Sequence, residues 1–169
     1  MTRIIPYLTM LGALLVQVAL VPNVAVGGVT PNVLLLAAVT IALVKGSRAG
    51  IVAGFVGGLL FDLLGSGPIG VGAMVFCVVA FVAASLKENT FADGWLVPLV
   101  IVFLASLVGE IGYMTVLAVL GQGAGTLGGI LGRALPAGLY NVVVAVVFYP
   151  WVARFLRRDK PMTTFRRLA

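Results

Sequence analysis

Two acidic side chains inside apolar runs are the residues of this sequence best placed to carry chemistry. Asp62 follows a glycine-rich stretch, and Glu110 lies within the apolar residues 95–120. Two carboxylates could in principle act as a general acid and a general base. A carboxylate in apolar surroundings is costly unless it is paired, neutral or hydrated, so it indicates a functional site by default. The alternative for Glu110 is a structural hydrogen bond to Asn141, to Gln17 or to a backbone carbonyl.

The remaining residue types argue against an enzyme. The chain has no histidine, which is the commonest general base in proteins and the commonest metal ligand. Its one cysteine, Cys77, cannot form an internal disulfide and suits a small core residue. The glycine-rich residues 121–132 lack the strand and the Lys-Ser/Thr pair of a phosphate-binding loop, and neither a nucleophile elbow nor a zinc motif occurs. We therefore expect no catalytic site, no metal and no cofactor.

The composition predicts that lipid surrounds most of the chain. Of the 169 residues, 62% are hydrophobic and only 9% are charged, with a mean hydropathy of +1.20. Soluble domains average about 45–50% apolar and about 25% charged residues, so they could not hide this much apolar surface. The formal net charge is +6, but the basic residues lie in loops and in the tail. That placement suits membrane orientation and anionic lipid headgroups rather than nucleic acid.

Six apolar segments, separated by turn-forming or charged residues, predict an all-α integral membrane protein with a bundle of six transmembrane helices. We expect these helices at residues 4–21, 33–44, 49–64, 69–86, 95–120 and 135–156. The second is too short for a hydrocarbon core of roughly 30 Å, so either Pro31 and Asn32 open it inside the membrane or the bilayer or the protein adapts locally. Residues 121–132 contain six glycines and predict a flexible connector. The domain division is a transmembrane domain at 1–156 and a basic cytoplasmic tail at 157–169.

The distribution of positive charge predicts the orientation. With six crossings both termini lie on one side of the membrane, and that side carries ten of the 11 Lys and Arg residues. Only Arg133, just outside the sixth segment, lies on the other side. The positive-inside rule then predicts a multi-pass protein of the bacterial cytoplasmic (inner) membrane with both termini in the cytoplasm.

This orientation gathers the strongest polar candidates of the apolar segments into one half of the membrane. Each of these candidates falls in the outer half, where they predict a polar cavity or a partner groove that opens outward. The members of this predicted outward polar cluster are Gln17, Asn32, Asp62, Glu110, Arg133 and Asn141.

A second candidate surface is formed by glycines on the third segment. Gly50, Gly54 and Gly58 recur at every fourth residue, with Ala53 and Gly57 beside them, so one face of the helix is nearly flat. In a bilayer such a face lets a second helix approach closely. It either packs internally or receives a partner helix. With the turn that follows it, the predicted packing face comprises Gly50, Gly54, Gly57, Gly58, Asp62, Pro68 and Gly70.

Several motifs resemble the rod shape-determining protein MreD family. They are Pro-Asn-Val-Leu-Leu-Leu at 31–36, Lys-Gly-Ser-Arg-Ala-Gly at 45–50, Gly-Phe-Val-Gly-Gly-Leu-Leu-Phe-Asp-Leu-Leu at 54–64, Gly-Pro-Ile-Gly at 67–70 and the closing segment 139–150. The family commonly has Pro-Asp where this chain has Pro31-Asn32. The resemblance implies a non-enzymatic inner-membrane scaffold of the bacterial cell-elongation machinery, which makes peptidoglycan.

The resemblance also implies partners. The expected direct partner is MreC, a single-pass protein with a periplasmic coiled coil, which leads indirectly to MreB, RodA and a penicillin-binding transpeptidase. The family is similar in architecture to the six-helix substrate-binding subunits of energy-coupling-factor transporters. The alternative function is therefore a small-molecule-binding subunit of a vitamin transporter, with Asn32, Asp62, Glu110 and Asn141 on the ligand. The sequence shows no aromatic lining for such a pocket, which favours the scaffold, and it leaves a homo-oligomer open.

Overall fold

All the named secondary-structure elements are helical in the residues that the computed structural model describes, namely 4–90, 94–122 and 126–157. This confirms the predicted all-α class. The described elements are α1 (Ile5–Ala19), the 3-10 turn η1 (Val21–Val24), α2 (Val33–Lys45), α3 (Ser47–Leu64), α4 (Val71–Glu88), α5 (Leu96–Val119) and α6 (Leu127–Arg157). Residues 158–169, most of the predicted basic tail, lie outside the described part.

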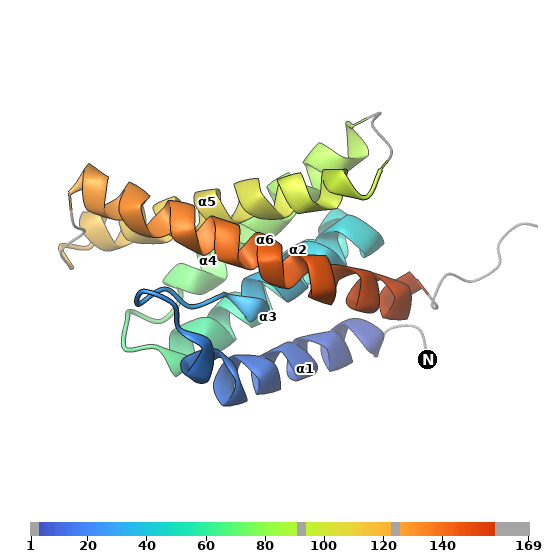
Figure 1. The fold of residues 1–169 in the computed structure, drawn as a ribbon, viewed down its shortest axis with the longest axis horizontal. Helices are drawn as coiled ribbons and strands as arrows, with labels where there is room; N and C mark the ends of the chain where they lie inside the picture. Colours follow the sequence, from blue (N-terminus) through green and yellow to red (C-terminus); the bar gives the residue numbers. More distant parts are fainter. Residues whose placement is uncertain (1–3, 91–93, 123–125, 158–169) are drawn as a thin grey trace, which may run out of the picture.

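The helices run back and forth along one long axis, so their connections gather at two ends (Figure 1). We call the end where α1 begins and α6 ends the terminal end. Lys45, Arg48, Lys87 and Arg157 lie there, at the ends of their helices. At the opposite end α2, α4 and α6 begin.

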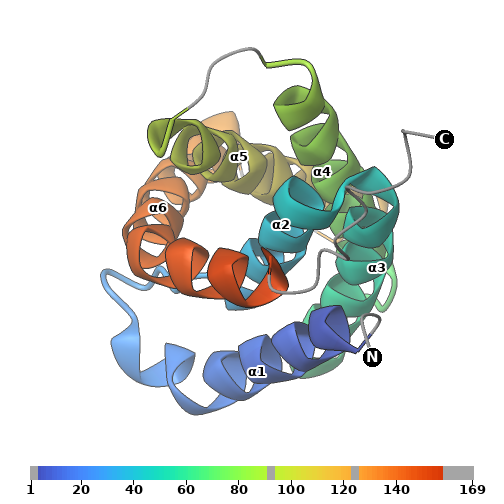
Figure 2. The ribbon, with the colours of Figure 1, turned by 90° about the vertical axis from the view of Figure 1, so that its right-hand side faces the viewer.

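Helix α2 is the centre of the bundle. It contacts α1, α3, α4, α5 and α6, and these helices surround it when the molecule is viewed along its length (Figure 2). Every residue from Val33 to Ala42 is buried. A helix that is apolar on all sides suits the core of a protein as well as a lipid environment, so the uniformly apolar sequence of α2 is compatible with its central position.

Four of the described helices are long and apolar enough to cross a membrane, namely α3, α4, α5 and α6. Helices α1 and α2 are shorter, with 15 and 13 residues. The outer surface of the bundle is apolar, since large side chains such as Phe55, Phe81 and Val147 are exposed. Exposed apolar surface on this scale indicates lipid as the surrounding solvent. The chain is therefore an all-helical membrane protein.

Helices α3 and α4 pack backbone to backbone through the glycines of α3. A Cβ atom added at Gly54 would lie 2.5 Å from the carbonyl oxygen of Phe76, and one at Gly58 would overlap the backbone of Gly72. Gly50 packs in the same way against Ala42 of α2. Glycine is the only residue that permits these approaches, so the flat face of α3 is filled within the chain itself.

Helix α6 begins earlier than the sequence suggests. It starts at Leu127, eight residues before the predicted start at 135, so the prediction of a flexible connector through residue 132 is wrong. Arg133 consequently lies inside α6 and not before it. Glycines are tolerated in the helices of membrane proteins, because a backbone in apolar surroundings must satisfy its hydrogen bonds internally. Residues 123–125 of the predicted connector lie outside the described part.

Candidate functional site

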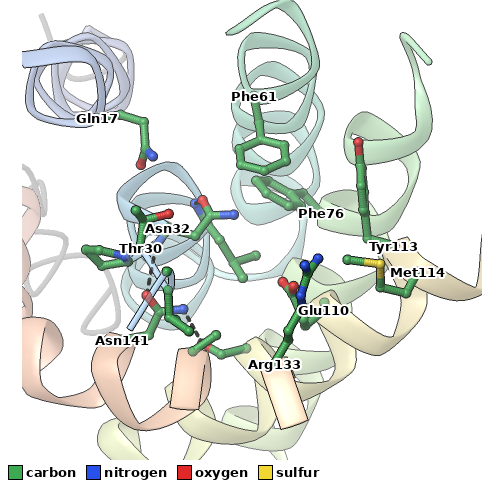
Figure 3. Close-up of a pocket in the computed structure, with 17 residues that line it drawn as sticks. Gln17, Thr30, Asn32, Phe61, Phe76, Glu110, Tyr113, Met114, Arg133 and Asn141 are labelled. Carbon is green, nitrogen blue, oxygen red and sulfur yellow. Dashed lines mark hydrogen bonds between the residues drawn. The ribbon is translucent and has the colours of Figure 1, made fainter. Parts of the chain in front are cut away.

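A cavity of about 280 Å³ lies between the helices toward the opposite end of the bundle (Figure 3). All six helices and the loop before α2 contribute to its wall. The lining includes Gln17, Thr30, Asn32, Phe61, Phe76, Ser106, Glu110, Tyr113, Met114, Arg133 and Asn141. Five of the six residues predicted for the outward polar cluster therefore lie on one cavity, and Asp62 does not.

Three amide side chains of this wall accept hydrogen bonds from backbone N–H groups at the start of α2. The Asn141 Oδ1 atom accepts a hydrogen bond from the Asn32 N–H at 2.8 Å, and the Gln17 Oε1 atom accepts one from the Val33 N–H at 2.8 Å. The Asn32 side chain accepts from the Leu35 N–H at 2.9 Å, as a helix N-cap does. Three of the N–H groups at the start of α2 are thus bonded, to α6, to α1 and to the cap residue.

Asn141 also joins α6 to α5. Its Nδ2 group donates a hydrogen bond to the Ser106 Oγ atom at 3.0 Å, and both side chains are 3% exposed. Buried polar groups require partners, so this chain of bonds fixes the amide orientation and leaves Asn141 little capacity to bind a ligand. Asn141 and Gln17 are accordingly structural parts of the cavity wall.

Asp62 performs a different structural task, away from the cavity. Its side chain is 2% exposed and faces the start of α4. The carboxylate accepts hydrogen bonds from the backbone N–H groups of Gly70 at 2.8 Å, Gly72 at 2.9 Å and Ala73 at 3.3 Å. A negative charge on the N–H groups at a helix start is stabilised by the helix dipole, so Asp62 caps α4 from the end of α3. Gly70 has φ +106°, which favours glycine, at the turn that makes this approach possible.

The two charges of the cavity belong to Glu110 on α5 and Arg133 on α6. Both side chains line the cavity, and their charges interact electrostatically (Figure 3). Within the described residues, neither side chain makes a hydrogen bond or a close ion pair. Glu110 is half-buried and Arg133 is exposed. These two groups are therefore available to an incoming polar or charged group, unlike the amides beside them.

Aromatic rings form the remaining side of the cavity. The Phe61 ring lies 5.5 Å from the Phe76 ring and 5.9 Å from the Tyr113 ring, centroid to centroid, the second pair meeting edge to face. The expectation that the pocket lacks an aromatic lining is therefore wrong. The three residues come from α3, α4 and α5, so only the packing of these helices brings them together.

Of the lining residues that the sequence reasoning missed, Ser106 and Tyr113 lie on the same face of α5 as Glu110. Ser106, Glu110 and Tyr113 are spaced four and three residues apart, which places them on the same side of a helix. From the position of Glu110, that spacing could have identified Ser106 and Tyr113 in the sequence. The described residues hold no cluster of three potential metal ligands. The cavity thus combines one carboxylate, one guanidinium and an aromatic wall, an arrangement suited to recognition.

Comparison with known proteins gives one match. The family model described as rod shape-determining protein MreD matches residues 1–159. No curated protein and no solved structure matches the chain.

Proposed function

The chain belongs to the MreD family of rod shape-determining proteins, and we propose that it acts as a non-enzymatic scaffold of the cell-elongation machinery by binding MreC. The family match confirms the resemblance in the sequence motifs and indicates a role in rod shape determination. Through MreC the chain would be linked to MreB, RodA and a penicillin-binding transpeptidase. The observation that carries the proposal is the cavity, whose wall holds a carboxylate and a guanidinium beside aromatic rings.

The proposed setting is the bacterial cytoplasmic membrane, with six crossings and both termini in the cytoplasm. Positive charge at the terminal end supports this orientation, because Lys45, Arg48, Lys87 and Arg157 all lie there. The short α2 is compatible with a crossing, since its first N–H groups are bonded by Asn141 and Gln17 rather than left to the lipid. In this orientation the cavity opens toward the periplasm.

The contacts within the chain favour the cavity over the glycine face as the surface for MreC. The backbone of α4 fills the face at Gly54 and Gly58, so a partner helix could dock there only by displacing α4. The cavity, in contrast, lies on the side where the coiled coil of MreC is expected. We infer that the segment joining the membrane helix of MreC to its coiled coil contacts Glu110 and Arg133.

Co-purification tests this proposal directly. Full-length chain carrying Glu110→Gln or Arg133→Gln is expressed with tagged MreC, solubilised in mild detergent, and the ratio of the two proteins is measured. Glu110→Gln keeps the size of the side chain, and Arg133→Gln shortens a side chain that is exposed, so we expect normal folding and a several-fold loss of MreC. Arg157→Gln, at the terminal end, is the matched control and should retain MreC. Full MreC recovery with both cavity variants would contradict the proposed contact surface.

The aromatic wall supports a second candidate function, a small-molecule-binding subunit of a vitamin transporter. Phe61, Phe76 and Tyr113 give the cavity the apolar lining of a ligand pocket, although about 280 Å³ is at the lower end of the usual range of about 300–1,000 Å³. A ligand that binds only the folded chain raises its unfolding temperature. A thermal shift with one vitamin, lost in Glu110→Gln, would replace the scaffold proposal with this one.

A further inference from the structure

A second cavity, with no part in the site above, lies between α1 and α3 at the terminal end. Its volume is about 620 Å³. Its wall is apolar over most of its length and has two basic residues at one end. The lining consists of Pro6, Tyr7 and Met10 of α1, Lys45 of α2, and Arg48, Ala49, Val52, Ala53 and Val56 of α3. We call it the α1–α3 groove.

The charges of the α1–α3 groove gather at the level where α2 ends and α3 begins. Lys45 is the last residue of α2, and Arg48 is in the first turn of α3, where its side chain is exposed. Tyr7, in the first turn of α1, is 59% exposed beside them. Tyrosine is enriched where a membrane helix meets the headgroup layer, so this end of the groove has the residues of a membrane interface.

The depth of the groove matches one leaflet of a bilayer. Along α3, Arg48 and Val56 are separated by eight residues, or about 12 Å at 1.5 Å per residue. Half of a hydrocarbon core of roughly 30 Å is about 15 Å. A ligand whose charged group lay at Arg48 would therefore extend its apolar part past Val52 to Val56 without leaving its own leaflet.

We propose that the α1–α3 groove binds an anionic phospholipid of the cytoplasmic leaflet, with its phosphate at Arg48 and Lys45 and one acyl chain along Val52 and Val56. Basic pockets between membrane helices on the cytoplasmic side recognise acidic headgroups, which supplies the charge complementarity. This site is independent of the proposed binding of MreC, which uses the other end of the bundle.

The charge of the groove favours an anionic lipid over an apolar partner helix. The groove carries its basic residues, Lys45 and Arg48, at one end of an otherwise apolar wall. An apolar helix would place uncharged residues against Arg48, whereas a phosphate supplies the opposite charge at that level.

Native mass spectrometry of the full chain in detergent tests the headgroup. Phosphatidylglycerol and phosphatidylcholine with identical acyl chains are added at equal concentration, and the bound fractions are compared. We expect a preference for phosphatidylglycerol that falls about fivefold for each charge removed in Lys45→Gln and Arg48→Gln. Arg157→Gln removes a charge at the same end outside the groove and should leave the preference unchanged. Equal binding of the two lipids would overturn the proposal.

A second experiment locates the acyl chain. Val52→Trp fills the groove, and Val78→Trp places the same ring on the exposed face of α4. Only Val52→Trp should reduce retention of phosphatidylglycerol. A photoreactive residue at position 52, introduced in cells, then reports the occupant whether or not the tryptophan variant folds. A cross-link to phospholipid supports the proposal. A cross-link to a second copy of the chain or to a partner helix overturns it, as does retention unchanged by Val52→Trp.

Discussion

The Asn141 side-chain oxygen accepts a hydrogen bond from the backbone N–H of Asn32 at 2.8 Å, across 109 residues of sequence. This bond joins the middle of α6 to the start of α2. It explains how a helix of 13 residues can form the centre of a membrane protein. The unpaired N–H groups at its start face side chains of the same chain, so α2 does not need to extend to the water layer.

Asn141→Ala should destabilise the chain. The substitution leaves the Asn32 N–H and the Ser106 hydroxyl without their partner, and a buried unsatisfied group costs about 1–3 kcal/mol in water-soluble proteins, with a smaller mean of about 0.6 kcal/mol for hydrogen bonds within membranes. The unfolding temperature in detergent measures this loss. Asn23→Ala is the control, because Asn23 is exposed and, within the described residues, its side chain bonds only to the Ala19 carbonyl, four residues before it. Equal unfolding temperatures for the two variants would show that the network carries no stability.

Substitution of Asp62 should loosen the start of α4 first. Asp62→Ala removes every hydrogen bond to Gly70, Gly72 and Ala73, with an expected cost of about 1–2 kcal/mol, as for other helix N-caps. Asp62→Asn keeps one acceptor oxygen and loses the charge, so it should lie between wild type and alanine. Amide hydrogen exchange of residues 70–74 is the measurement. Exchange that rises evenly over the whole chain would argue against a local cap.

Gly58→Ala should be far more damaging than Gly12→Ala. The new methyl group at position 58 would overlap the backbone of Gly72, and an overpacked core typically costs about 1–3 kcal/mol or more. At Gly12 of α1 no atom beyond its chain neighbours and the adjacent backbone of α1 lies within 4 Å of the added carbon, and alanine is the better helix former. Folded yield and unfolding temperature compare the two. Any loss of MreC in Gly58→Ala should therefore accompany loss of folded protein.

The proposed orientation predicts which positions a membrane-impermeant maleimide can reach in spheroplasts. In a Cys77→Ser background, Val26→Cys and Gln122→Cys lie at the opposite end of the bundle and should be labelled from outside. Arg157→Cys lies at the terminal end and should react only after the membrane is opened. The reverse pattern would place the cavity on the cytoplasmic side. The periplasmic part of MreC could then not contact it.

The ranges of the central helices were predictable from sequence, while part of the sixth was not. Residues 33–44 and 49–64 were expected to be helical, and the observed helices are Val33–Lys45 and Ser47–Leu64. Proline, glycine and charged residues bound these apolar runs. For α6 the glycines of residues 128–132 indicated flexibility, because glycine is a poor helix former in water. In apolar surroundings the backbone has no better partner than itself, so the helix continues through them.

Candidate residues were easier to find than their roles. Asp62, Glu110 and Asn141 were singled out because a polar side chain in an apolar run needs a partner. Which partner each has was not readable, since Asp62 bonds to the start of α4 and Asn141 to two other helices. The aromatic wall was missed for the same reason, because Phe61 and Tyr113 are far apart along the chain.

The amino-acid sequence by itself determined that this protein is helical, that lipid surrounds it, which family it resembles and which few polar residues matter. Those properties follow from composition, local periodicity and short motifs, which act over a turn or two of helix. Only the tertiary structure decided that the glycine face is filled by α4, that Asp62 is a cap, and that Glu110 and Arg133 line one cavity. Such contacts depend on how separate helices are positioned against each other, and local sequence does not encode those distances.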